Sequence, residues 1–301
     1  MSGAPWTSGP EALWLSGPGS GSTSPESASL PLASTRLGAG PPLLLLPGLA
    51  SPRDEFAQVL PQLAQRYDVL ALDLPGQGAS PSLPPEVLPT VTALTDAVER
   101  ELDRAGLAAA HVLGVSLGGR VALELARRGR ALSVVAIAPT GPVTPVERAY
   151  QVAVLALSRA GMRVVAPAAD LLLRLPPLRA AVLAPLRAQG WRVPAPEAAA
   201  LARSFAYSPD FWRLLGFAMA PEATIDYRSV TCPVVLAQGT HDVISLGQVL
   251  RLVTLVPGAR FALLPLAGHS AVGDVPDRVL ELVADAVAAA RGSRPAPGAR
   301  A

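Results

Sequence analysis

Short apolar runs alternate with amphipathic stretches along most of the chain. The runs predict strands at 43–46, 67–73, 111–115, 132–138, 233–238 and 260–264. Helical patterns lie at 91–105, 117–128 and 276–291, and a further helix is expected with Ser51 as N-cap and Pro52 in its first position. Short strands that alternate with helices indicate parallel βαβ units. The predicted fold class is α/β, with a mostly parallel central sheet covered by helices on both faces.

This alternation stops at Pro139 and resumes at Cys232. The residues between are mostly helical in pattern, strongly apolar and rich in clustered aromatics. We expect a helical cap, residues 142–228, inserted into a core made of residues 1–141 and 229–301. A leading strand is expected near 12–15, and residues 1–25 and 292–301 are expected to be flexible.

Composition narrows the possible partners. The formal net charge is +2 without a basic cluster, so no nucleic-acid surface is expected. One cysteine and three histidines argue against an intramolecular disulfide or a metal site, and no cofactor is expected. We find no signal peptide and no uninterrupted apolar run of about 18 residues, so no membrane span is expected. The prediction is a cytoplasmic monomer or homodimer that acts on a small molecule.

The segment Gly114-Val115-Ser116-Leu117-Gly118 stands between a predicted strand and a predicted helix. This is the pattern of a nucleophile elbow, in which a tight turn exposes the Ser hydroxyl above a helix N-terminus. Small residues are needed two positions before and two after the Ser. The free N–H groups at that terminus suit a developing oxyanion. Ser116 is therefore the predicted nucleophile.

Order along the chain selects the base and the acid. His111 begins the strand that ends at the elbow, about 16 Å from Ser116. His269 follows the strand after the one that leads to His241, and the order nucleophile, acid, histidine makes it the predicted base. Asp242 leaves the carboxyl end of a strand and is the predicted acid that orients His269. Asp274 is the weaker alternative for that role.

The chain resembles the lipase/esterase-like α/β-hydrolases over roughly residues 30–290. Besides the three residues above, Asp73-Leu74-Pro75-Gly76-Gln77-Gly78-Ala79-Ser80 resembles the D-x-P-G-x-G-x-S loop of that family, and Gly268-His269 with Pro276 matches its histidine region. Similar sequences include proline iminopeptidases, meta-cleavage-product hydrolases and enol-lactone hydrolases. The resemblance implies an oxyanion hole made by the backbone N–H groups of Leu49 and Leu117.

Pro47-Gly48 departs from that family, which usually has His-Gly at this place. A Pro donates no hydrogen bond, so the sequence leaves the posture of the oxyanion loop open. Ser116 departs from epoxide hydrolases and haloalkane dehalogenases, which use Asp as nucleophile, so neither of those activities is expected.

The expected activity is cleavage of an ester, lactone or similar acyl bond of a small to medium apolar substrate through an acyl-enzyme. Arg120, Phe211 and Trp212 are the candidate substrate contacts. One alternative is a lyase of the menaquinone-pathway type, because Arg120 matches an Arg that binds an anionic substrate there. The other is a non-catalytic receptor that has kept its Ser-Asp-His set.

Overall fold

Parallel strands form the centre of the fold, in a computed structural model that describes residues 30–217 and 226–292. Within that part of the chain, seven strands pair in the order β1-β3-β2-β4-β5-β6-β7. Only β1 runs antiparallel to its neighbour. The strands are β1 (Ser34–Leu37), β2 (Pro42–Leu46), β3 (Asp68–Leu72), β4 (Ala110–Val115), β5 (Ala131–Ile137), β6 (Val234–Gly239) and β7 (Arg260–Leu264). The predicted α/β fold class is confirmed.

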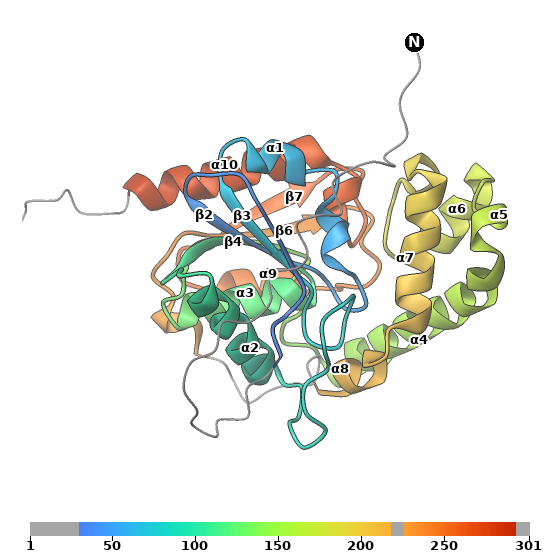
Figure 1. Cartoon of the computed structure of the whole chain (residues 1–301), viewed down its shortest axis with the longest axis horizontal. Coiled ribbons are helices and arrows are strands. Elements are labelled where there is room, and N and C mark those ends of the chain that lie inside the picture. Colours follow the sequence, from blue (N-terminus) through green and yellow to red (C-terminus); the bar gives the residue numbers. More distant parts are fainter. Residues whose placement is uncertain (1–29, 218–225, 293–301) are drawn as a thin grey trace, which may run out of the picture. The chain divides into compact units, whose positions relative to one another are not determined.

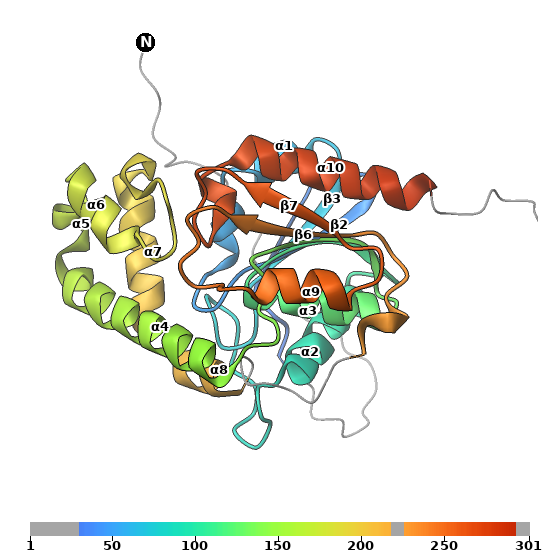
Figure 2. The same cartoon turned by 180° about the vertical axis from the view of Figure 1, so that it is seen from behind.

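Helices cover both faces of this sheet (Figure 1, Figure 2). One face carries α2 (Val91–Arg104), α3 (Leu117–Arg127) and α9 (Gln248–Leu255). The other carries α1 (Leu60–Ala64) and α10 (Pro276–Gly292). Both faces of the central strands are therefore withdrawn from water, which explains why those strands read as continuous apolar runs.

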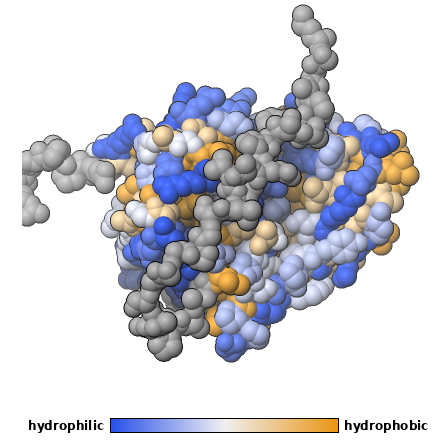
Figure 3. Space-filling model, viewed as in Figure 1, coloured by the Kyte–Doolittle hydropathy of each residue, from blue (hydrophilic) through white to orange (hydrophobic). Residues whose placement is uncertain are grey.

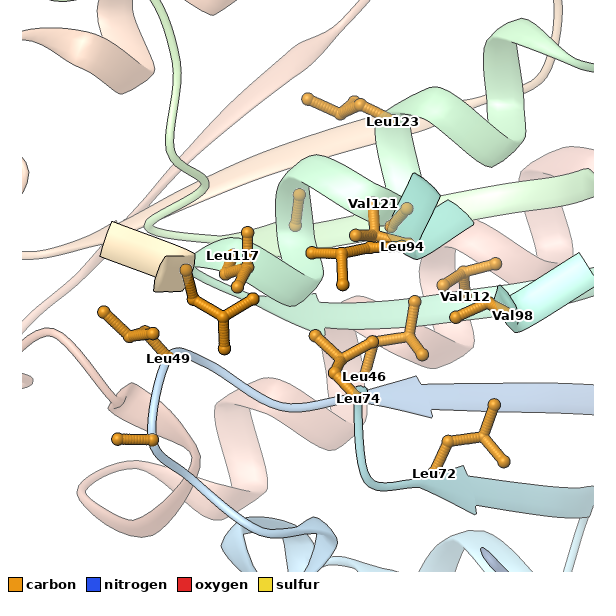
Figure 4. Close-up of a cluster of buried hydrophobic side chains, with 14 of the residues drawn as sticks. Leu46, Leu49, Leu72, Leu74, Leu94, Val98, Val112, Leu117, Val121 and Leu123 are labelled. Atoms are coloured by element: carbon orange, nitrogen blue, oxygen red, sulfur yellow. The ribbon is translucent and has the colours of Figure 1, made fainter. Parts of the chain in front are cut away.

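Strand β2 shows this double burial most clearly. Leu44 and Leu46 belong to the core cluster on the α2 and α3 side, whereas Leu43 and Leu45 belong to the cluster on the α10 side. Figure 4 shows Leu46 within the first cluster, against Leu94 of α2 and Val121 of α3. Burying one Leu is worth about 2 kcal/mol, so this strand anchors both layers.

The described residues between β5 and β6 are mostly helical and are called the cap below. Its helices are α4 (Pro145–Val165), η3 (Ala166–Ala168), α5 (Ala169–Leu172), α6 (Pro176–Leu183), η4 (Gly190–Arg192), α7 (Ala195–Tyr207) and α8 (Phe211–Phe217), and η5 (Tyr227–Ser229) precedes β6. Thr144 and Glu147 form a capping box that starts α4. Helices α4 and α7 pack against each other. The domain limits at 142 and 228 stay predictions.

One helical stretch of the cap bears on the expected absence of a membrane span. Residues Pro145–Leu172 are long and apolar enough to cross a membrane, by length and composition only. The sequence reading missed this stretch because it required an uninterrupted apolar run, whereas mean hydropathy tolerates Arg159 and Arg163. Figure 3 shows hydrophobic surface at the outer end of the cap. Leu171 in α5 and Leu175 just before α6 have exposed side chains.

Several short elements differ from the sequence expectation. Ser51 is not a helix N-cap, because the chain enters a 3-10 turn, η2 (Arg53–Phe56), without a side-chain cap. Strand β1 and helix α9 were not predicted, since each is too short to show a clear period. Gly292, expected in a flexible tail, ends α10. The expected strand at 12–15 and the flexible segments 1–25 and 293–301 lie outside the described residues.

Candidate active site

Ser116 sits on a strained turn between β4 and α3. Its backbone angles are φ 52° and ψ −113°, a region that non-glycine residues rarely adopt and that costs about 1–3 kcal/mol. Its N–H donates to Ile137 O at 2.8 Å, and its carbonyl accepts from Arg120 N at 3.1 Å and Thr140 N at 3.2 Å. Hydrogen bonds from three directions hold the strained residue in place.

The glycines of the elbow are required by close backbone approach. A Cβ on Gly114 would stand 2.4 Å from Gly118 O, and one on Gly118 would stand 2.2 Å from Leu46 O. Both distances lie far inside van der Waals contact. Any larger residue would therefore displace either the elbow or the end of β2.

His269 lies in the loop after β7 and faces Asp242, which follows β6. The His269 Nδ1 atom is 3.1 Å from both carboxylate oxygens of Asp242 and 3.3 Å from Ser245 Oγ. The Asp242 side chain is fully buried, and its Oδ1 also accepts the backbone N–H groups of Ile244 and Ser245. A carboxylate can only accept, so Nδ1 carries the proton and Nε2 keeps its lone pair for use as a base.

The pair is electrostatically coupled. Burial raises the pKa of Asp242, but the charge of His269 and the hydrogen bonds from His269, Ser245 and Ile244 outweigh burial and hold that pKa below its usual value. Burial lowers the pKa of His269, but the charge and hydrogen bond of Asp242, with the charge of Glu55, raise it above 6.5 on balance. The buried pair therefore favours an ionised Asp242 and stabilises an imidazolium at His269.

Ser116 and His269 line one small cavity at the carboxyl ends of the strands. Its walls are Gly48, Leu49, Ser51, Glu55, Val115, Ser116, Leu155, Leu186, Phe205, Ile244, His269 and Ser270. Leu155 and Phe205 come from cap helices α4 and α7, and Leu186 follows α6. The cavity volume is about 20 Å³ on a scale on which one water needs roughly 10–15 Å³. The cap therefore closes the site.

Two backbone amides, those of Leu49 and Leu117, are the candidate oxyanion donors. Leu117 begins α3, where the N–H has no partner inside the helix. In residues 30–217 and 226–292, Leu49 N–H donates no hydrogen bond to the protein. Figure 4 shows Leu49 in the loop after β2 and Leu117 in the first turn of α3, at the same edge of the core cluster. The two predicted donors thus come from adjacent segments.

Residues of the D-x-P-G-x-G-x-S loop hydrogen-bond to the segment that follows β2. Asp73 accepts the backbone N–H of Arg53 at 2.6 Å and pairs with its guanidinium at 2.5 Å. Its Oδ2 also accepts Ala79 N–H at 2.9 Å. Gln77 accepts the N–H of Ala50 through its side-chain oxygen. The motif therefore acts on the geometry of the site without lining the cavity.

The remaining predicted residues lie elsewhere. Arg120 is buried in α3, Phe211 packs edge-on against Phe205, and Trp212 is 55% exposed; none of them lines the cavity. As substrate contacts all three stay predictions. His111 is buried beside Ser133, and His241 is exposed beside Thr240, so neither faces Ser116.

Several residues of the site were not predicted from the sequence. Glu55, Ser245 and Ser270 surround His269, and Leu155, Leu186, Phe205 and Ile244 form the apolar wall. Ser245 could have been found three residues after Asp242, where an Asp commonly binds nearby backbone amides. The others carry no local signal, because they reach the site from distant segments.

These features define an α/β-hydrolase. A serine stands on a turn between a strand and a helix, a histidine binds a buried aspartate, and two backbone amides lie nearby, all at the carboxyl edge of a parallel sheet. The sequence profile of the alpha/beta hydrolase family matches residues 43–282. The chain belongs to this family and is a hydrolase.

Sequence relatives carry several names. The chain is 35% identical over 200 residues to "Epoxide hydrolase EphH" of Mycobacterium tuberculosis, a match that covers 63% of this chain and 91% of that protein. It is 39% identical over 107 residues to the pimeloyl-[acyl-carrier protein] methyl ester esterase of Chromobacterium violaceum, covering 34% of this chain and 39% of the esterase. The second match spans well under two thirds of the relative.

Solved structures share the fold at lower identity. The enol-lactonase from Burkholderia xenovorans LB400 superposes with a TM-score of 0.67 at 22% identity, over 85% of this chain and 96% of that one. The meta-cleavage product hydrolase from Pseudomonas fluorescens IP01 gives a TM-score of 0.64 at 18% identity, over 84% and 92%. At such identities the likeness concerns the fold alone.

Proposed function

We propose that this protein is a serine esterase or lactonase that cleaves a small, neutral, apolar acyl substrate through an acyl-enzyme on Ser116. The observation that carries the proposal is that His269, hydrogen-bonded to buried Asp242, lines one cavity with Ser116 and Leu49, whose amide has no acceptor among the described residues. These are the four parts that acyl transfer needs: nucleophile, base, orienting acid and oxyanion donor.

The reaction runs in two halves. His269 Nε2 takes the proton of Ser116 as its Oγ attacks the acyl carbon, and the Leu49 and Leu117 amides stabilise the resulting oxyanion. The imidazolium then protonates the leaving alcohol, and the C–O bond breaks to leave the acyl-enzyme. A water repeats the sequence, with His269 as base, and releases the acid.

The cavity walls support the substrate class. Leu155, Leu186, Phe205 and Ile244 offer an apolar surface to an acyl chain. The one charged side chain besides His269 among the described lining residues is Glu55, and no Arg lines the cavity there. A carboxylate substrate would meet like charge without a counter-ion, which disfavours the anion-binding lyase.

Epoxide opening is the second candidate, because a relative that matches 63% of this chain is named for it. Ring opening calls for a carboxylate at the nucleophile position, where this chain has Ser116. Both activities are therefore included in the test.

The test joins a fluorophosphonate probe with a substrate panel. Native protein should be labelled at Ser116 and should hydrolyse p-nitrophenyl esters or lactones, and S116A should do neither. His269→Ala should abolish activity, whereas the matched control His241→Ala should keep it. Equal labelling of S116A, or turnover of styrene oxide without turnover of any ester or lactone, would refute the proposal.

A further inference from the structure

Glu55 is a buried carboxylate that the triad chemistry does not use. It lies in η2, is 5% exposed and lines the same cavity as Ser116 and His269. Burying a carboxylate is costly unless hydrogen bonds satisfy its oxygens. Its partners therefore show what the position holds together.

The two oxygens of Glu55 bind two different catalytic loops. Oε2 accepts the backbone N–H of Gly48 at 3.0 Å, in the loop that carries Leu49. Oε1 accepts the hydroxyl of Ser270, the residue after His269. Hydrogen bonds to a carboxylate are about twice as strong as neutral ones, so this bridge resists separation of the two loops.

The other amides of the loop after β2 show what the bridge achieves. Gly48 N–H binds Glu55, Ala50 N–H binds Gln77, and Ser51 N–H binds Gly48 O. Leu49 N–H alone of these four has no protein acceptor in the described part of the chain. The amides on both sides of Leu49 are thus held by side chains, which fixes the direction in which the Leu49 N–H points.

Pro47 contributes no hydrogen bond donor to this bracing. Proline supplies neither a side-chain donor nor a backbone N–H to hold the start of the loop. The side-chain oxygens of Gln77 and Glu55 instead bind the backbone N–H groups of the loop.

We propose that Glu55 is a positioning residue that ties the oxyanion loop to the His269 loop and aims the Leu49 amide at the reacting oxygen. The inference rests on the proposed function. Its charge has a second consequence, since Glu55 also raises the pKa of His269, after the larger effects of burial and Asp242. Asp242 and Glu55 are the charged groups that act on His269; Arg53, on the same turn as Glu55, is engaged by Asp73.

Two substitutions separate geometry from charge. Glu55→Ala removes both hydrogen bonds and should lower kcat for p-nitrophenyl acetate by about 10²-fold, the usual cost of a lost oxyanion donor, with KM changed less than about threefold. Glu55→Gln keeps an oxygen for Gly48 and a polar group for Ser270. It should retain more than a tenth of kcat and move the inflection of kcat/KM to lower pH. The matched control is Asp54→Asn, which changes an exposed neighbouring acid. It should neither lower kcat nor move the inflection of kcat/KM.

Fluorophosphonate titration normalises each rate to the correctly folded fraction, and thermal melting reports stability. Wild-type kcat in Glu55→Ala, or a Glu55→Gln profile with an unmoved inflection, overturns the proposal. If Glu55→Ala does not fold, two other results test the proposal. Ser270→Ala must lower kcat at constant KM, and Glu55→Gln must move the inflection of kcat/KM to lower pH. If only the Glu55 proposal fails, the protein is still an active enzyme whose activity S116A abolishes. If the proposed function fails, no acyl-enzyme forms.

Discussion

At the scale of single residues, the two ring nitrogens of His269 face different partners. Asp242 accepts the hydrogen bond from the Nδ1–H group of His269, so Nε2 keeps its lone pair. An uncharged amide at position 242 can donate to Nδ1 and so favour the wrong tautomer. This orientation depends on a carboxylate that is itself held by the amides of Ile244 and Ser245.

Asp242→Asn should therefore lower kcat by about 10⁴-fold while the protein stays folded, as in other triads. Steady-state kinetics with p-nitrophenyl esters and a thermal melt measure the two effects. Ser245→Ala removes the weaker contact to Nδ1, at 3.3 Å, and serves as comparison with an expected loss of tenfold or less. A loss of less than about tenfold in Asp242→Asn would mean that Asp242 does not orient the base.

The raised pKa of His269 sets the pH dependence. Catalysis needs the neutral imidazole, so kcat/KM should rise with pH through an apparent pKa above 6.5 and be lost as the pH falls below it. Because the folded pKa exceeds the unfolded one, the same group stabilises the fold fully below pH 6.5 and loses that contribution as pH rises through the folded pKa. Rates between about pH 5 and 9 test this. His241→Ala should leave the inflection in place, and a plateau already reached below pH 6.5 would contradict the prediction.

The sequence could predict Ser116, Asp242 and His269 because each follows a strand in a fixed order. It could not predict Glu55, because the contact with Ser270 joins positions 215 residues apart. Nor could it show that Glu55 and Gln77 accept the backbone N–H groups of Gly48 and Ala50, because those contacts appear only in the folded chain.

At the scale of elements, segments with a clear apolar or helical pattern were predicted well, whereas β1 and α9 were not predicted. Strand β7 matches its expected limits, and α2 and α3 end within one residue of theirs. Helix α9 has eight residues and β1 has four, too few to display a period against their surroundings. The expected helix after Ser51 is wrong: the chain forms the 3-10 turn η2, in which the Glu55 carboxylate binds Gly48 and Ser270.

The segment after α6 is tied to the His269 loop by one acid, Asp274. This buried carboxylate accepts the N–H groups of Gly268 at 2.8 Å, Ala188 at 2.8 Å and Gln189 at 3.1 Å. Ser270 N–H also donates to Leu186 O at 2.9 Å. The cap and the base are therefore joined by a small hydrogen-bonded unit.

Asp274→Ala should destabilise the protein by about 3 kcal/mol, because it leaves buried amides without acceptors. Urea denaturation followed by circular dichroism measures the change. Asp285→Ala removes an exposed acid from α10 and should stay within about 0.5 kcal/mol of wild type. If both variants unfold at the same urea concentration, Asp274 does not hold the cap segment to the loop.

At the scale of the whole described unit, the cap is hydrogen-bonded to three loops of the candidate site. Gln151 of α4 donates to Ile244 O beyond Asp242, Leu186 accepts from Ser270, and Ser204 of α7 donates to Ala50 O beside Leu49. The loops that carry Asp242, His269 and Leu49 are thus all hydrogen-bonded to the cap. Since the cavity volume is only about 20 Å³, we expect the cap to move when a substrate enters.

The seated cap should also decide which acyl chains fit. Leu155 of α4 lines the cavity, whereas Leu157, two residues along the same helix, is 73% exposed. Leu155→Ala removes three carbons from the wall and should raise the ratio of kcat/KM for p-nitrophenyl octanoate over acetate by roughly tenfold. Leu157→Ala makes the same chemical change outside the cavity and should leave the ratio unaltered. An equal shift in both variants would mean that helix stability rather than the wall sets the preference, and no shift in either would place the acyl chain elsewhere. Leu155 lines the cavity, whereas Gln151 on the same helix binds Ile244 in the Asp242 loop and is unchanged in this variant. We therefore expect the altered ratio to come mainly from KM, with kcat for p-nitrophenyl acetate preserved.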